Sequence, residues 1–273
     1  GLDLSDLRVS VSGKGVIVHL TEMPRMSPND LKSSIKYEAE MLLPFSLDDC
    51  VFDCPILDPE AGDKAKMRVA LAAARKSVVG ERLDLLKDIG LVPKLLGVDS
   101  IAVANAFEYA MPDIKPEDTV SVVHAGAGRT ILNVITAKNL DLTRDIEVGG
   151  NNATLAIARG LSIGFREAER RKEASDPEVI EFMTPMAMVL ARELRSTFGY
   201  ISSKMGRNVS AIYLSGGCAL SHGLRDILSS EFGIPVSVWD PLRGISVEGG
   251  AGRQGIKGKE PLLAVAAGLA VSD

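Results

Sequence analysis

Hydrophobic and polar positions alternate through much of the first hundred residues, and this alternation gives way to a helical period several times. Residues 7–20 alternate on both sides of Gly13 and Gly15, which predicts two short strands joined by a tight turn. Residues 31–42 repeat apolar side chains every three or four positions, which predicts a helix that begins after Ser27 and ends before Pro44. The same criteria predict strands at 51–57, 67–74 and 92–98, and helices at 78–89 and 100–109. This part of the chain is therefore predicted to be an α+β unit.

A polar segment at 113–118 marks a predicted boundary, which divides the chain into residues 1–110 and residues 111–273. Apolar runs after it predict strands at 119–123, 131–136, 142–147, 211–214 and 235–238. Helical periodicity predicts helices near 152–173, 177–204, 222–232 and 261–271, the last preceded by a glycine-rich loop at 249–258. Strand, helix and strand alternate at 211–238 as a βαβ unit, which indicates an α/β fold.

Composition excludes several classes of protein. The chain has 273 residues with a net charge of −5, and only 4% of them are aromatic, which argues against nucleic-acid binding. No apolar run reaches the roughly 18 residues of a membrane span, and the first residues do not form a signal peptide, so we expect no direct membrane insertion.

The cysteines do not suggest a disulfide framework or a metal site. The chain has three cysteines, and Cys50 and Cys54 lie in a segment predicted to be extended, which would hold them about 13 Å apart. Only three histidines accompany them, and they are scattered. We expect reduced thiols and no metal ligands.

Two glycine-rich turns are candidates for phosphate binding. The first, within residues 122–130, follows an apolar run and consists of Gly126-Ala127-Gly128-Arg129-Thr130. Glycine lets backbone N–H groups approach an anion closely, although an ordinary hairpin turn explains the same residues. The second, Gly216-Gly217, ends a predicted strand and leads into a helix whose N-terminus could face a ligand, and a plain βα turn is its alternative.

Several segments, taken in order along the chain, resemble one family of proteins. They are 34–45 (SIKYEAEMLLPF), 69–75 (VALAAAR), 145–151 (DIEVGGN), 168–172 with Glu169 and Lys172, 214–217 (LSGG) and 262–271 (LLAVAAGLAV). Their order resembles the actin-like nucleotide-binding fold of actin, heat-shock chaperones and sugar kinases. More closely, the chain is similar to the type IV pilus assembly protein PilM family, which is related to the cell-division protein FtsA.

The resemblance implies an α/β actin-like fold that is N-terminally incomplete, because the family's first phosphate loop would precede these residues. Residues 1–110 would hold the remainder of the first actin-like subdomain with an inserted α+β subdomain. Residues 111–273 would form the second half with a helical insertion, and a closing helix at 260–271 would return to the first half.

The resemblance also implies an ATP-magnesium site that is weak or absent in this chain. Its expected residues are Gly126, Ala127, Gly128, Arg129, Thr130, Glu169, Lys172, Gly216 and Gly217. Family members usually carry an acid at the position of His124, where a carboxylate can organise hydrated magnesium, and imidazole does this poorly. His124 as a hydrogen-bonded hairpin residue is the alternative. We assign no catalytic residue and do not expect hydrolysis.

By the same resemblance, the chain would be a cytoplasmic scaffold of a type IV pilus or type II secretion-like platform, peripheral to the inner membrane. Its partner would be the cytoplasmic tail of a PilN-like membrane protein, and other platform proteins or further copies of the chain are additional candidates. Tyr37, Leu43, Pro44 and Phe45 are the expected contacts, with core packing favoured for Phe45. An active ATPase or small-molecule kinase, and an FtsA-like filament former, are the alternatives.

Overall fold

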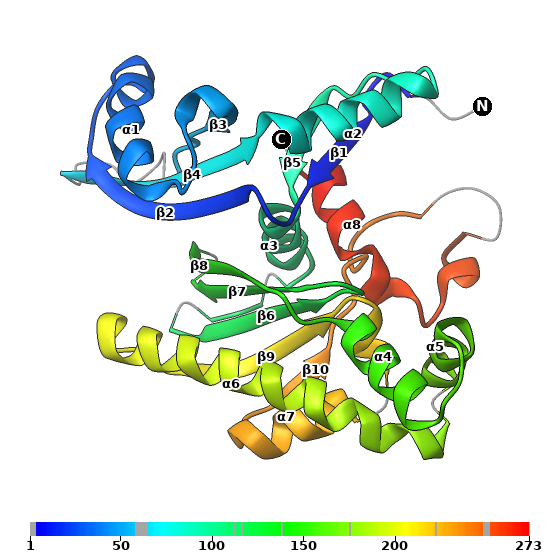
Figure 1. Ribbon diagram of the computed structural model, residues 1–273. Coiled ribbons are helices and arrows are strands. Elements are labelled where there is room, and N and C mark those ends of the chain that lie inside the picture. The colour runs from blue at the N-terminus through cyan, green and yellow to red at the C-terminus, as the bar shows by residue number, and fades with distance from the viewer. Residues whose placement is uncertain are drawn as a thin grey trace. The chain divides into compact units, whose positions relative to one another are not determined.

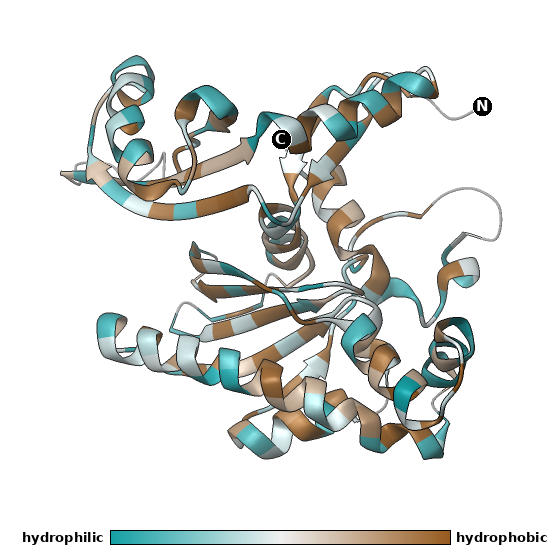
Figure 2. Ribbon diagram, viewed as in Figure 1, coloured by the Kyte–Doolittle hydropathy of each residue, from teal (hydrophilic) through white to brown (hydrophobic). Residues whose placement is uncertain are grey.

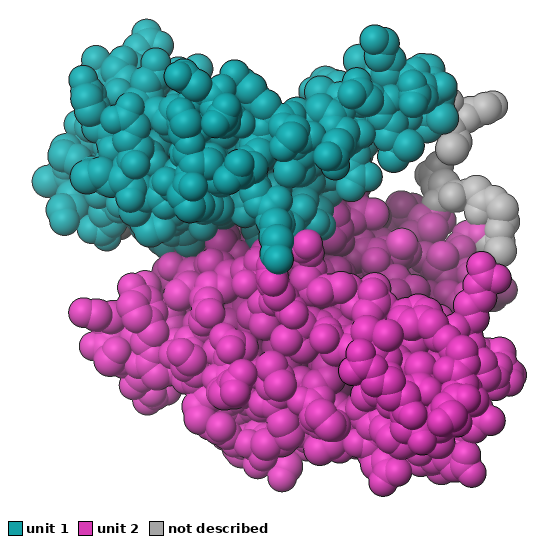
Figure 3. All heavy atoms as spheres, viewed as in Figure 1, with its two compact units in different colours: residues 1–101 teal, residues 102–273 magenta. Residues whose placement is uncertain are grey.

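The computed structural model describes residues 4–57, 65–111, 113–115, 117–137, 139–174, 176–221, 223–247 and 252–272. These residues form two units, Gly1–Ile101 and Ala102–Asp273, which Figure 3 colours separately. Parts of the predicted boundary segment at 113–118 and of the glycine-rich loop at 249–258 lie outside the described residues, as does His222 at the predicted start of a helix.

A three-stranded antiparallel sheet covered by one helix forms the first part of unit 1 (Figure 1). In sheet order its strands are β2 (Val16–Pro24), β4 (Lys66–Arg75) and β3 (Cys50–Asp53). The helix α1 (Pro28–Leu42) begins at Ser27, whose side chain accepts a hydrogen bond from the Asp30 amide, as an N-cap does. Leu31, Ile35 and Ala39 of α1 are buried in one cluster with alternate residues of β4. The predicted helix and its cap are therefore confirmed.

A parallel pair of strands and a second helix complete unit 1. They are β1 (Arg8–Val11), β5 (Leu95–Val98) and α2 (Lys76–Asp88). The tight turn predicted between the first two strands is present: the Val16 amide donates to the Gly13 carbonyl at 2.8 Å. Gly13 and Gly15 have φ values of 102° and 94°, a region that favours glycine, so the turn depends on them.

The core of unit 2 is a five-stranded mixed sheet with the order β10-β9-β6-β7-β8. Its strands are β6 (Thr119–Ala125), β7 (Thr130–Thr136), β8 (Asn139–Ile146), β9 (Val209–Ser215) and β10 (Val236–Val238). The chain winds β6, β7 and β8 as an antiparallel meander, while β9 and β10 run parallel to β6. The central strands carry hydrophobic residues over much of their length (Figure 2), because both faces of the sheet are covered.

Helices cover each face of this sheet (Figure 1). One face packs against α3 (Asp99–Ala110) and α8 (Ala264–Ala270), and the other packs against α6 (Ile180–Met205) and α7 (Leu224–Phe232). A Cβ on Gly268 of α8 would lie 1.7 Å from the Ala102 carbonyl oxygen, so α8 approaches α3 closely only because position 268 is glycine.

The helical stretch predicted near 152–173 is wrong as one element, because the chain forms two helices there. They are α4 (Gly150–Gly160) and α5 (Phe165–Glu173). Between them Ser162 has a φ of 52°, which no helix residue adopts, and Gly164 occupies the N-cap position of α5. The break turns α5 back against α4, and this places both helices beside the candidate site.

Candidate functional site

A cleft of about 540 Å³ lies in unit 2, where the chain leaves the carboxyl ends of β6 and β9. The β6–β7 hairpin, the first residue of α4 and the C-terminal half of α5 form part of its wall. The short 3₁₀ turn Gly217–Leu220, which follows β9, forms another part. Residues 258–262, just before α8, line the remaining side. Ligands of α/β proteins are commonly bound at this end of the strands.

The hairpin at the bottom of the cleft is anchored to the start of α4. The carbonyl oxygens of Gly126 and Ala127 accept hydrogen bonds from the amides of Gly150, at 2.9 Å, and Asn151, at 2.7 Å. A Cβ on Gly149 would lie 2.6–2.7 Å from three backbone atoms of the hairpin, so this approach requires glycine. The first amides of α4 therefore donate to the hairpin carbonyls and are not available to a ligand.

The hairpin still offers amide groups of its own. Within the described residues, no backbone acceptor is found for the N–H groups of Ala127, Gly128 and Arg129. Successive unpaired N–H groups in a tight loop form a concave site for an anion. Of these three residues only Ala127 lines the cleft, and Gly128 and Arg129 follow it at the hairpin tip, which is therefore the part next to the cleft that best fits a phosphate group.

A buried lysine organises the wall formed by α4 and α5. The Nζ atom of Lys172 donates to the Thr154 hydroxyl and to Oε2 of Glu169, each at 2.7 Å, and to the Gly150 carbonyl at 3.2 Å. Thr154 also donates to Glu169, and Lys172 is only 6% exposed. All three protons of the ammonium group are therefore used within the protein. Among the described residues no hydrogen bond is found for Oε1 of Glu169, and because Glu169 lines the cleft, this oxygen is the polar atom of the group that could meet a ligand.

The electrostatics of the cleft follow from these contacts. Burial disfavours the charged form of Glu169, but the hydrogen bonds from Lys172 and Thr154 outweigh it and hold the pKa of the carboxyl below its ordinary value. Burial raises the pKa of the Cys218 thiol to about 11, and its Sγ lies 3.3 Å from the Gly126 carbonyl oxygen. Cys218 is therefore a neutral thiol at neutral pH and a poor nucleophile.

Among the residues expected to bind a cofactor, the structure brings Gly126, Ala127, Glu169, Lys172 and Gly217 together around the cleft. The other four expected residues are described as well, but they do not line it.

Three of those four residues have structural contacts instead. Arg129 lies 3.4 Å from the Asp145 carboxylate, and the Thr130 hydroxyl donates to the Val148 carbonyl at 2.7 Å. Gly216 has a φ of 84° and would place a Cβ 2.4 Å from the Ala125 carbonyl oxygen. Gly128 lies at the hairpin tip, where a Cβ would meet nothing within 4 Å.

His124 pairs with Ser215, a residue of the segment 214–217 that was not itself expected to take part in a site. Its Nδ1 lies 3.0 Å from Oγ of Ser215, directly opposite on the neighbouring strand β9. A serine beside a histidine is the arrangement of an activated nucleophile, but Ser215 is fully buried and a nucleophile must reach its substrate. The contact fits the hydrogen-bonded hairpin residue that was the alternative for His124. No cluster of three potential metal ligands is found in the part of the chain that the structure describes.

The expected partner residues of unit 1 differ in their exposure. Tyr37 is 75% exposed and Pro44 is exposed, whereas Leu43 is buried in the core beneath α1. Phe45 is half-buried against the same core, with the Arg75 guanidinium 4.8 Å from its ring centre. Met41, one helical turn after Tyr37, is 74% exposed and was missed, although its spacing from Tyr37 could have indicated a shared face.

Comparison with known proteins identifies relatives of the whole chain. The family model described as type IV pilus assembly protein PilM matches residues 1–273. The chain is similar to a chain of a solved "PilM-PilN type IV pilus biogenesis complex", with 25% identity, a TM-score of 0.86, and coverage of 97% of this chain and 78% of that one.

A more distant structure shows the fold alone. MreB 5 of Spiroplasma citri bound to AMPPNP is 14% identical, with a TM-score of 0.51 and coverage of 72% of this chain and 64% of that one. The predicted actin-like α/β fold is confirmed. Across the described residues, no helix has the length and apolar character needed to cross a membrane.

Proposed function

We propose, because the chain belongs to the family of type IV pilus assembly protein PilM, that it is a scaffold of the inner-membrane platform on which type IV pili are assembled. One observation carries the proposal: nearly the whole chain shares its fold and a quarter of its sequence with a chain of the PilM-PilN complex. The partner we propose is the cytoplasmic tail of a PilN-like membrane protein. The chain would then lie on the cytoplasmic side and reach the membrane through that partner, and other platform proteins are further candidates.

The exposed side of α1 is the surface that we propose for the tail. Tyr37 and Met41 lie one turn apart on α1, and Pro44 is exposed just beyond the last residue of the helix, Leu42. We call these three residues the Tyr37–Met41–Pro44 stripe. The buried side of α1 packs through Leu31 and Ile35, so changes to the stripe leave the packing of the helix intact. An extended tail can anchor on such a surface with a few apolar side chains.

Substitution of Tyr37 tests the scaffold proposal. We expect Tyr37→Ala to weaken binding of a synthetic PilN-like tail, measured by calorimetry, by about 1–2 kcal/mol if Tyr37 is an anchor. Tyr200→Ala is the matched control, because Tyr200 is also exposed but belongs to α6 in unit 2. Unchanged binding by Tyr37→Ala, together with cross-links from the tail to residues beyond 110, would place the partner site elsewhere and refute the assignment.

The cleft of unit 2 suggests a second, subordinate property. The N–H groups at the hairpin tip and the open Oε1 of Glu169 favour a nucleotide as ligand, through phosphate and ribose contacts respectively. The remaining polar groups, including Lys172 and His124, already have protein partners. We therefore propose that magnesium-ATP binds weakly or not at all and is not hydrolysed.

A further inference from the structure

The wall of the cleft formed by α5 is a short and strongly polar helix. It has nine residues, and within it only Ala168 and Lys172 are buried. A helix of this length is not stable on its own in water, so its position depends on the contacts it makes with the rest of unit 2. On the inner side these are the packing of Ala168 against Ile157 and Val179 and the hydrogen bonds of Lys172.

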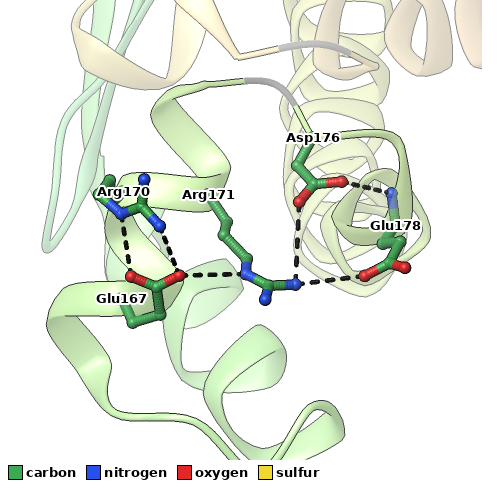
Figure 4. A network of polar contacts seen from close by, with 5 residues as sticks. All are labelled: Glu167, Arg170, Arg171, Asp176 and Glu178. Atoms are coloured by element: carbon green, nitrogen blue, oxygen red, sulfur yellow. Dashed lines mark hydrogen bonds and ion pairs between the residues drawn. The ribbon is translucent and has the colours of Figure 1, made fainter.

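On the outer side, one arginine ties α5 to the following segment (Figure 4). Arg171 lies 3.2 Å from Glu167 in its own helix, 3.8 Å from Asp176 and 3.2 Å from Glu178. Asp176 accepts a hydrogen bond from the Glu178 amide at 3.0 Å and so caps the 3₁₀ turn Pro177–Val179, which leads into α6. Both carboxylates that Arg171 contacts outside α5 therefore belong to this one capped turn. Arg171 therefore connects the cleft wall to the long helix of the unit.

In the part of the chain that the structure describes, Arg170, the preceding residue, makes no such connection. Its guanidinium makes two hydrogen bonds to Glu167, at 2.9 and 2.7 Å, and both partners belong to α5 (Figure 4). Hydrogen bonds from Arg170 and then Arg171 lower the pKa of Glu167 to about 2, so Glu167 is ionised at neutral pH. Neighbouring arginines of one helix thus differ in whether they bridge to another element.

A thiol lies behind the inner contacts of α5. A Cβ on Gly150 would lie 2.9 Å from Sγ of Cys218 and 3.1 Å from Nζ of Lys172, so the thiol and the ammonium group both lie against Gly150. Cys218 lines the cleft, yet it is only 3% exposed, so part of the surrounding wall must move before a reagent reaches its sulfur. Lys172 is the neighbour of this thiol that α5 contributes, and an outward movement of α5 would uncover the sulfur from that side.

We propose that α5 is a movable wall of the cleft and that Arg171 is the positioning residue that holds it closed. When the contacts of Arg171 to Asp176 and Glu178 break, α5 swings away from α4, Lys172 leaves Thr154 and Gly150, and Cys218 becomes accessible from the cleft. The closed position presents Glu169 to a ligand, and the open position admits one. The inference concerns unit 2 alone and does not depend on the proposed tail binding by unit 1.

The rate at which Cys218 is alkylated measures the opening directly. Iodoacetamide is added to the full chain, and the carbamidomethyl group on each cysteine-containing peptide is followed by mass spectrometry over time. When closing is faster than reaction, the rate is proportional to the open fraction. We expect Arg171→Gln to speed the reaction of Cys218 about three- to tenfold, the range that a few partly exposed ion pairs supply. Cys50 and Cys54, buried in unit 1, are internal references whose rates should not change.

Three controls separate an opening wall from a general loss of stability. Arg170→Gln removes the same charge from the same helix and should leave the Cys218 rate within about twofold of the wild type, since it breaks no contact between elements. Glu178→Gln, at a position 71% exposed, removes one of the partners and should give a smaller increase than Arg171→Gln. Amide hydrogen exchange should speed up in 165–173 and remain unchanged in β6 and β7.

The outcomes decide the proposal in both directions. An equal Cys218 rate in Arg171→Gln and wild type overturns it, as does an equal acceleration by Arg170→Gln. Acceleration that is accompanied by faster exchange throughout β6 and β7 also overturns it, because Arg171 would then stabilise the unit as a whole. High salt provides an independent check: at about 1 M the ion pairs are screened, and the rates of wild type and Arg171→Gln should converge.

Discussion

Replacing Lys172 by methionine removes the ammonium group on which the wall of the cleft is organised. The change keeps a side chain of similar length but eliminates three hydrogen bonds, two of them at 2.7 Å. A hydrogen bond to a charged group contributes about 1.5–3 kcal/mol, but the Glu169 carboxylate left behind is about a third exposed, and water replaces part of what is lost. We therefore expect Lys172→Met to lower the free energy of unfolding of unit 2 by about 1–3 kcal/mol at pH 7.

The loss should depend on pH with a definite sign. The pKa of Glu169 in the folded protein lies below its ordinary value of 4.5, so the pair with Lys172 contributes its full stability above that pH. The contribution is lost as the pH falls through the lowered folded pKa. The difference in stability between wild type and Lys172→Met should therefore be largest near neutrality and narrow below about pH 4.5.

Urea denaturation followed by tryptophan fluorescence is a suitable assay, because Trp239 is the only tryptophan of the chain and is buried in the core of unit 2. Lys259→Met is the matched control: Lys259 lines the same cleft but is exposed, and its loss should cost less than about 0.5 kcal/mol. If Lys172→Met costs no more than Lys259→Met, or if its cost is the same at pH 7 and pH 4, the reasoning about the buried pair is refuted.

Two further predictions concern the hairpin of the cleft. Gly149→Ala should lower the free energy of unfolding of unit 2 by at least about 1–3 kcal/mol, because the new Cβ would clash with backbone atoms of the hairpin. Gly128→Ala is the control in the same denaturation assay and should be nearly neutral, because the space around Gly128 is open. Magnesium-ATP should give no micromolar binding by calorimetry and no phosphate release above background, and micromolar affinity with turnover would contradict the proposal of a weakened site.

Local periodicity was sufficient for most helices and for the strands of unit 1, because each of them buries one face, while β6 and β7 bury both faces and were found as apolar runs. The stripe of α1 through Leu31 and Ile35 and the alternation of β4 identify the same buried cluster from both sides. The break between α4 and α5 escaped this reasoning, since Leu161 and Ile163 continue an apolar pattern and pack against the same small cluster. The positive φ of Ser162 that ends the pattern has no signature in the sequence.

The site was predictable where backbone chemistry defines it and not where side chains from distant segments meet. Gly126 and Gly217 were found because glycine marks close approach, and both line the cleft. Thr154 and Cys218 were missed, because nothing in an apolar helix or after a glycine turn indicates that their polar atoms meet Lys172 and the Gly126 carbonyl. Arg129, in turn, was expected at a ligand because of its loop, whereas the pairing of β7 with β8 puts Asp145 within its reach.

A common physical feature underlies the proposals for both units. A site that binds a charged ligand tightly keeps its hydrogen-bond donors free until the ligand arrives. In this cleft, Lys172 already donates three hydrogen bonds within the protein, and the first amides of α4 donate to the hairpin carbonyls. Binding would first have to break these contacts, and their free energy would be subtracted from any affinity. Unit 1 has the opposite character: Tyr37 and Met41 are three-quarters exposed, with their apolar atoms facing water, so a partner that covers them gains the hydrophobic contribution without breaking a contact in the described part of α1. For this reason we expect the partner protein to bind at α1. We expect the cleft to have the shape of a nucleotide site but a low affinity for nucleotide.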